Sequence, residues 1–219
     1  MSAPEELIGR LSAGLVPVRP ISPWRRGLAL SGLAAVLVAL ATVIAGFRPD
    51  LHYRLMLPQD VMQWLASIAT GGLALLAAAM LAQPDRHRAW ALLPLPAAAV
   101  WIGALGLGCL GDMARLGPEA MEVTTSWGCL RFIIGLGLPL TVVSLLLLRH
   151  AWPMRAVPVA ALAGLGAAAF CSAGLSLFHH LDAALMVLLW HGMATLVTVG
   201  LAALVGRALP RAIQGSREA

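Results

Sequence analysis

The sequence predicts an all-α membrane protein, a six-transmembrane-helix bundle with both termini in the cytoplasm. Of its 219 residues, 60% are hydrophobic and 11% are charged, and the mean hydropathy is +0.85. A soluble domain is about 45–50% apolar and about 25% charged, and a soluble fold of this length cannot bury so many apolar side chains. The apolar runs are continuous and rich in Ala and Leu, which favours helices over a membrane β-barrel. These observations exclude a water-soluble enzyme and a disordered chain.

Residues 1–26 are expected to form a cytoplasmic amphipathic helix and a proline-rich linker. No apolar run follows a basic start, so this segment lacks the pattern of a signal peptide. Ser2 and Glu5 have the spacing of a capping box that begins the helix. Prolines at every third position after the helix favour a polyproline II segment, which leads to an interfacial Trp-Arg-Arg anchor. The apolar face of the helix consists of Leu7, Ile8, Leu11 and Leu15, with Glu5, Glu6 and Arg10 elsewhere.

Six apolar runs between residues 27 and 206 are long enough to cross a bilayer, for which a helix needs about 20 residues. Pro94 and Pro96 should kink the third span near its start. Residues 207–219 then form a cytoplasmic tail. The six predicted spans are Gly27–Phe47, Val61–Ala82, Ala89–Leu110, Trp127–Leu148, Val157–Phe178 and Ala183–Gly206.

The arginines give the bundle its predicted orientation. The chain has 15 arginines and no lysine against 10 acidic residues, which gives a net charge of +5 and a pI of about 10.4. Single arginines at helix ends indicate membrane topology rather than nucleic-acid binding, so we expect contact with membrane lipid and no direct nucleic acid. Eleven arginines lie on the side that holds both termini and three on the other, which places the termini in the cytoplasm. Arg131 lies inside the fourth span, where it can snorkel or favour the thiolate of a nearby cysteine.

This topology places all three cysteines and four of the six histidines in the outer half of the bundle or its outer loops. Two interpretations stay open: these residues pack and anchor helices, or they form a thiol or metal sensor facing an oxidising compartment. The chain has no CxxC and no HExxH, so spacing alone defines no metal site. A Cys109–Cys129 disulfide is sterically possible if the third and fourth spans are neighbours. The sensing candidates are Cys109, Cys129, Cys171, His179 and His180, and the metal candidates are Cys129, His179 and His180.

Two other functional classes are compatible with a six-span bundle: a small membrane transporter, and a redox protein with haem or quinone. A transporter or proton pump usually needs more buried ionisable groups than this chain has. A haem bundle needs paired histidines at matching depth, whereas only His191 lies deep in a span. We therefore expect no resident cofactor and at most transient binding of a thiophilic metal ion.

Five short motifs occur in order along nearly the whole chain. They are Glu6-Leu7-Ile8, Leu15-Val16-Pro17-Val18-Arg19 before Pro23-Trp24-Arg25-Arg26, Gly46-Phe47-Arg48-Pro49-Asp50-Leu51, Ser126-Trp127-Gly128-Cys129 and Trp190-His191-Gly192. Together they resemble the NrsF family of six-span inner-membrane anti-sigma factors.

The resemblance implies a regulator of transcription in the bacterial inner membrane rather than an enzyme. Such proteins hold an extracytoplasmic-function (ECF) sigma factor away from RNA polymerase and release it in a stress response to heavy metals or oxidants that periplasmic cysteines sense. Cys129 matches the family cysteine that begins the fourth span; where a second cysteine is expected, this chain has His179-His180. Cys171, Cys109 or a mixed Cys/His site are the possible substitutes. The expected sigma-binding residues are Glu5, Glu6, Leu7, Ile8, Leu11, Leu15, Val18 and Arg19.

Overall fold

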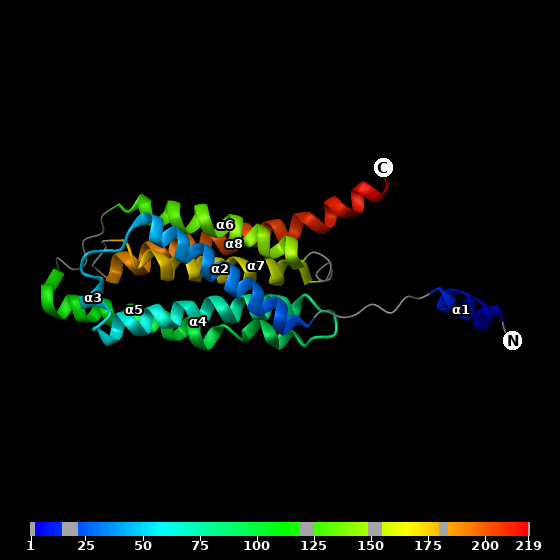
Figure 1. The fold of residues 1–219 in the computed structure, drawn as a ribbon, viewed down its shortest axis with the longest axis horizontal. Helices are drawn as coiled ribbons and strands as arrows, with labels where there is room; N and C mark the ends of the chain where they lie inside the picture. The colour runs from blue at the N-terminus through cyan, green and yellow to red at the C-terminus, as the bar shows by residue number, and fades with distance from the viewer. Residues whose placement is uncertain (1–2, 15–21, 119–124, 149–154, 180–183, 219) are drawn as a thin grey trace.

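Six long helices lie side by side in one elongated bundle in the computed structural model (Figure 1). The structure describes residues 3–14, 22–118, 125–148, 155–179 and 184–218. Six helices in this part of the chain are long and apolar enough to cross a membrane, which confirms the predicted all-α, six-span class. The long helices are α2 (Pro23–Ala45), α4 (Pro58–Leu81), α5 (Leu95–Leu116), α6 (Trp127–Leu148), α7 (Ala156–Leu175) and α8 (Ala184–Glu218).

Three short helices complete the described chain: α1 (Ala3–Ala13), α3 (Leu51–Arg54) and the 3₁₀ helix η1 (Arg88–Leu92). η1 precedes α5 in place of a simple kink in the third span. Pro94 lies just before α5 and Pro96 within its first turn, where a missing backbone N–H costs no helical hydrogen bond. The two prolines therefore start a new helix.

Several helix ends differ from the predicted boundaries, including those of α2, α5 and α8. α2 begins at Pro23, four residues early, because proline is compatible with the first turn of a helix. It ends at Ala45, and the following residue, Gly46, has a φ of 83°, which glycine readily adopts. At the other end of the chain, the backbone of α8 stays helical to Glu218, so the tail expected after residue 206 continues the sixth helix.

α7 is the central helix and packs against α4, α6 and α8. Its buried face is rich in Ala and Gly, which lets neighbouring backbones approach closely. At the crossing with α4, a Cβ added to Gly166 would lie 2.6 Å from the Cγ of Leu75 and 3.1 Å from the backbone oxygen of Gly71. Only glycine fits there without moving the helices apart. In contrast, large apolar side chains of α2 such as Val36, Val43 and Ile44 point outward, as expected for a lipid-facing surface.

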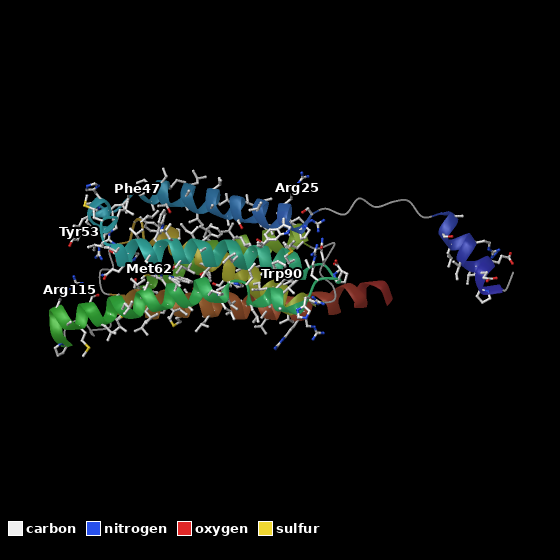
Figure 2. All side chains as sticks on the ribbon, turned by 90° about the horizontal axis from the view of Figure 1, so that it is seen from below. Arg25, Phe47, Tyr53, Met62, Trp90 and Arg115 are labelled. Atoms are coloured by element: carbon white, nitrogen blue, oxygen red, sulfur yellow. The ribbon has the colours of Figure 1, made fainter. Side chains whose placement is uncertain are left out.

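The bundle has two distinct ends, which we name after α3 and η1. Figure 2 shows Tyr53 and Arg115 at the α3 end and Arg25 and Trp90 at the η1 end. α2 starts at the η1 end and the C-terminal part of α8 leaves from it, so both termini extend from the same end of the bundle (Figure 1). The η1 end is held by Arg155, which donates a 2.6 Å hydrogen bond to the backbone oxygen of Arg86.

Candidate functional site

A thiol and an imidazole from distant parts of the sequence meet at the α3 end. The Sγ of Cys129 lies 3.6 Å from the Nε2 of His179. Cys129 belongs to the first turn of α6. His179 follows α7 in a turn in which its backbone N–H donates a 2.9 Å hydrogen bond to the carbonyl of Leu175. Gly128 leaves room for the ring, since a Cβ at that position would lie 3.4 Å from Nε2.

Neighbouring side chains hold this thiol–imidazole pair in place. The hydroxyl of Ser126, the residue before α6, lies 3.0 Å from the Sγ of Cys129. The ring of Phe178 packs edge-on against Phe132 of α6 at a centroid distance of 4.9 Å, which ties the turn after α7 to α6. Cys129 itself is fully buried. A reagent therefore reaches its sulfur only past the side chains that surround it.

The other two cysteines lie in different environments. Cys171 is fully buried on α7, and the next residue, Ser172, makes a 2.5 Å hydrogen bond with the Nδ1 of His191 on α8. Cys109 is half-buried on α5. α5 packs against α4 and α8, whereas α6 packs against α7 and α8. All three thiols are free, and the close packing that a Cys109–Cys129 disulfide requires is not among the main helix contacts of the described residues.

A buried arginine organises the loop between α2 and α4. Arg48 donates two hydrogen bonds to the carboxylate of Asp50, at 2.6 and 2.8 Å, and its backbone N–H donates to the carbonyl of Leu177. Arg54 also reaches Asp50, at 3.4 Å, and reaches Asp60 at 3.2 Å. The hydrogen bonds from Arg48 lower the pKa of Asp50 to about 2, and Arg54 acts in the same direction. This network fixes α3 over the end of the bundle.

The burial of Arg48 is a feature that reasoning from the sequence missed. The sequence places Arg48 in an outer loop and in the motif from Gly46 to Leu51, but neither observation predicts that its side chain is buried. The available signal is the Arg-x-Asp spacing of Arg48 and Asp50 shortly after α2, because an aspartate two residues away can neutralise and orient a buried guanidinium. Arg131, in contrast, has an exposed side chain on α6, as expected for a snorkelling residue.

A cavity of about 420 Å³ opens beside the thiol–imidazole pair, between α3, α4, α5 and α8. Both His179 and His191 line it, together with Arg48, Arg54 and Arg115. Asp112 at its edge accepts a 3.0 Å hydrogen bond from the backbone N–H of Ala184 and so caps the first turn of α8. The cavity has the size of a small-molecule site, and it places the imidazole of His179 beside polar side chains.

The predicted site residues are therefore only partly brought together. Cys129 and His179 meet, whereas Cys109 and Cys171 lie on other helices, and His180 is outside the described residues. No group of three or more His, Cys, Asp or Glu that could hold a metal ion occurs in the described part of the chain. Among the expected sigma-binding residues, Leu15, Val18 and Arg19 are also outside the described residues. The others, Glu5, Glu6, Leu7, Ile8 and Leu11, lie on α1 with exposed side chains.

The fold and this site define a class: a six-span helical membrane protein with an unpacked N-terminal helix beyond one end of the bundle and a thiol–imidazole pair at the other. Within that class the chain belongs to the NrsF family, described as negative regulator of sigma F, whose model matches residues 11–211. This match confirms the resemblance of the motifs and gives the protein a sigma factor as its partner. Comparison with curated proteins and with solved structures gave no significant match.

Proposed function

We propose that this protein is an anti-sigma factor of the bacterial inner membrane that binds an ECF sigma factor through α1 and releases it on thiol-reactive stress. The observation that carries the proposal is the separation of an unpacked amphipathic helix from a thiol–imidazole pair at the opposite end of the bundle. Membership of the sigma-regulator family supplies the partner. In this proposal α1 and both termini lie in the cytoplasm, and the α3 end faces the periplasm, in keeping with the arginine distribution.

α1 has the properties of a helix that docks into a groove on a protein. Leu7, Ile8 and Leu11 share one face, and their side chains are 53%, 64% and 67% exposed. Burying such a side chain against a partner contributes about 1.5–3 kcal/mol, so three of them can supply much of the affinity of a complex. The family match begins at residue 11, so most of this helix lies before the matched region. The sigma-binding role of α1 therefore rests on its exposed apolar face.

The geometry of the thiol–imidazole pair supports a role in sensing a soft metal ion. A tetrahedral ion with a metal–sulfur bond of about 2.3 Å and a metal–nitrogen bond of about 2.0–2.1 Å joins atoms about 3.5 Å apart. The observed separation between Cys129 Sγ and His179 Nε2 is 3.6 Å. Thiolate and imidazole are the ligands that thiophilic metals prefer. Two protein ligands leave positions for water, which suits transient binding, and the same thiol is the candidate target of an oxidant.

The pair is also placed to transmit a signal. Cys129 belongs to α6 and His179 directly follows α7, so an ion bound to both side chains holds these two helices at one relative position. α7 contacts α2, α4 and α8 as well. A change in its packing therefore reaches α2 and α8, which begin and leave, respectively, at the η1 end, the end from which α1 extends (Figure 1). Coupling of this kind requires a bundle with two arrangements, of which the metal-bound pair favours one.

The first experiment tests the sigma-binding helix. Deletion of residues 1–20 should abolish co-purification with an ECF sigma factor of the same organism, while membrane insertion is unchanged. Arg10→Ala is a matched control, because Arg10 is exposed on α1 but lies off the apolar face. Retained binding by a correctly inserted deletion variant would show that the sigma factor binds elsewhere.

The second experiment tests the sensing pair. Cys129→Ser and His179→Ala should each leave the sigma regulon unresponsive to cadmium, and each should weaken binding of cadmium to the purified protein. Cys109→Ser is the matched control, since Cys109 is a second thiol near the same end of the bundle but on a different helix. An unchanged response of the Cys129→Ser variant would remove this thiol from the mechanism.

A further inference from the structure

An apolar groove runs along α4 on the side that faces the membrane. All ten residues that line it are apolar, and they include Met62, Leu65 and Ala69 of α4 and Val100 of α5. Met62 lies in the half of the bundle nearer the α3 end (Figure 2). The groove extends along α4 from Pro58 to Ala69, which at helical rise is about 16 Å. The hydrocarbon of one leaflet is about 15 Å deep, half of the roughly 30 Å core of a bilayer.

The groove meets the polar cavity at the α3 end. Leu55, the residue after α3, lines both of them. The charged side chains that line the cavity are three arginines and two aspartates, and Asp50, which pairs with Arg48 and Arg54, is not among the lining residues. Arg115 is 64% exposed at the rim, where its guanidinium can turn toward a ligand while it stays near Asp112. The three arginines are balanced by Asp50, Asp60 and Asp112, so a molecule that is apolar along the groove and anionic at the cavity meets the exposed guanidinium of Arg115 rather than an excess of positive charge.

Trp64, one of the residues that line the cavity, has a buried ring nitrogen without a partner among the described residues. The Nε1 of Trp64 on α4 is buried, and it makes no hydrogen bond to the residues that the structure describes. An indole N–H at this depth is commonly satisfied by an acceptor at the membrane interface, where tryptophan places its ring in apolar surroundings and its N–H toward polar groups. The nitrogen has almost no accessible surface, so the ring must turn toward the cavity for an ester or phosphate oxygen of a lipid to serve as that acceptor.

We propose that one anionic phospholipid binds at this place, with an acyl chain in the groove and its headgroup oxygens at Arg115 and Trp64. The depth of the groove, its continuity with the cavity at Leu55 and the unpartnered indole N–H each fit this occupant. A helix of a second copy would cover the apolar groove but would leave the indole N–H unpaired. The lipid bridges α3, α4 and α5, three of the four helices around the cavity beside His179.

The groove is tested by filling it. Val100→Phe places a ring in the groove, whereas Ile102→Phe is the matched control on α5, because Ile102 is not among the lining residues. The two side chains are 47% and 58% exposed, so both variants should fold. Native mass spectrometry of protein extracted from vesicles of phosphatidylglycerol and phosphatidylethanolamine should show one retained phosphatidylglycerol. Its occupancy should fall about tenfold in Val100→Phe only, since the chain loses the burial of about two methylene groups.

The headgroup contact is tested with a charge change. Arg115→Gln should remove the preference for phosphatidylglycerol over phosphatidylethanolamine, Arg115→Lys should retain it, and Arg25→Gln at the η1 end should not alter it (Figure 2). Equal retention of both lipids by the unchanged protein would overturn the proposal. So would loss of a dimer, rather than of lipid, in Val100→Phe. A further outcome is that inorganic phosphate stabilises the unchanged protein and Val100→Phe as much as phosphatidylglycerol does. That result would identify a site for a free anion and would overturn the proposal of a bound lipid.

Discussion

The α3 end of the bundle and the N-terminal helix α1 have opposite constructions. At the α3 end, hydrogen bonds join residues that are far apart in the sequence, such as Arg48 to Leu177 and Ala184 to Asp112. The side chains of Cys129 and His179 meet within this framework. In α1, by contrast, the described side chains from residue 4 onward are exposed, and the helix lies apart from the bundle (Figure 1).

The two constructions suit two different physical requirements. A site that must hold two ligand atoms at a set distance needs its side chains fixed by surrounding structure. A segment that must bind a partner needs an apolar face that the protein does not cover itself. The α3 end has the first property and α1 has the second. In the proposed function, the sensing geometry and the sigma-binding face can therefore be changed independently, and each of the following variants tests one side of this division.

The largest effect is expected at α1. Replacement of Leu7, Ile8 and Leu11 by serine should weaken sigma-factor binding at least about 100-fold, because loss of a buried anchor at an interface often costs 2 kcal/mol or more, roughly 30-fold. The thermal stability of the bundle should not change, since these side chains are exposed. Binding is measured by titrating labelled sigma factor onto the protein in nanodiscs. A lower melting temperature of the bundle would contradict the separation of the two regions.

A smaller effect, on stability alone, is expected at the α3 end. Asp112→Ala removes the acceptor for the backbone N–H of Ala184, so the first turn of α8 loses its cap. Loss of a helix cap typically costs about 1 kcal/mol, which should appear as a lower midpoint in chemical denaturation of the detergent-solubilised protein. Asp85→Ala is the control, because Asp85 lies in an exposed position near the η1 end. Equal stability of the two variants would show that the cap contributes little.

The fold was largely predictable from the sequence. Six apolar runs determine six spans, because a bilayer admits only helices or closed barrels and these runs do not alternate. The ends of the helices were less predictable. Pro23 and Pro96 lie in first helical turns, yet proline is equally compatible with a linker or a kink. Which apolar residues face lipid could not be predicted, because lipid and protein interior are equally apolar and only the small residues of α7 mark the centre.

The sequence predicted how deep in the membrane the site residues lie, but it did not predict which of their side chains contact each other. Topology placed Cys109, Cys129 and His179 near one surface, whereas their distances depend on which helices are neighbours. The contact between Cys129 and His179 follows from the packing of α6 on α7, which spans 50 residues of sequence. The burial of Arg48 depends in the same way on a backbone contact with Leu177. The role of each residue in sensing stays a prediction.

The smallest effect is expected from the pH dependence of the loop that covers the α3 end. Hydrogen bonds from Arg48 lower the pKa of Asp50 from 3.8 to about 2, so the folded protein holds the carboxylate ionised at pH values where the unfolded chain binds a proton. The stabilisation is therefore complete above about pH 4 and is lost as the pH falls toward 2.

Melting temperatures of the unchanged protein and of Asp50→Asn, measured from pH 7 to pH 2, should differ by a constant amount down to pH 4 and then converge. Because Asp50 is partly exposed, the difference should be small. A difference that persists unchanged at pH 2 would mean that the ion pair with Arg48 does not hold this loop and that the α3 end is fixed by its backbone contacts.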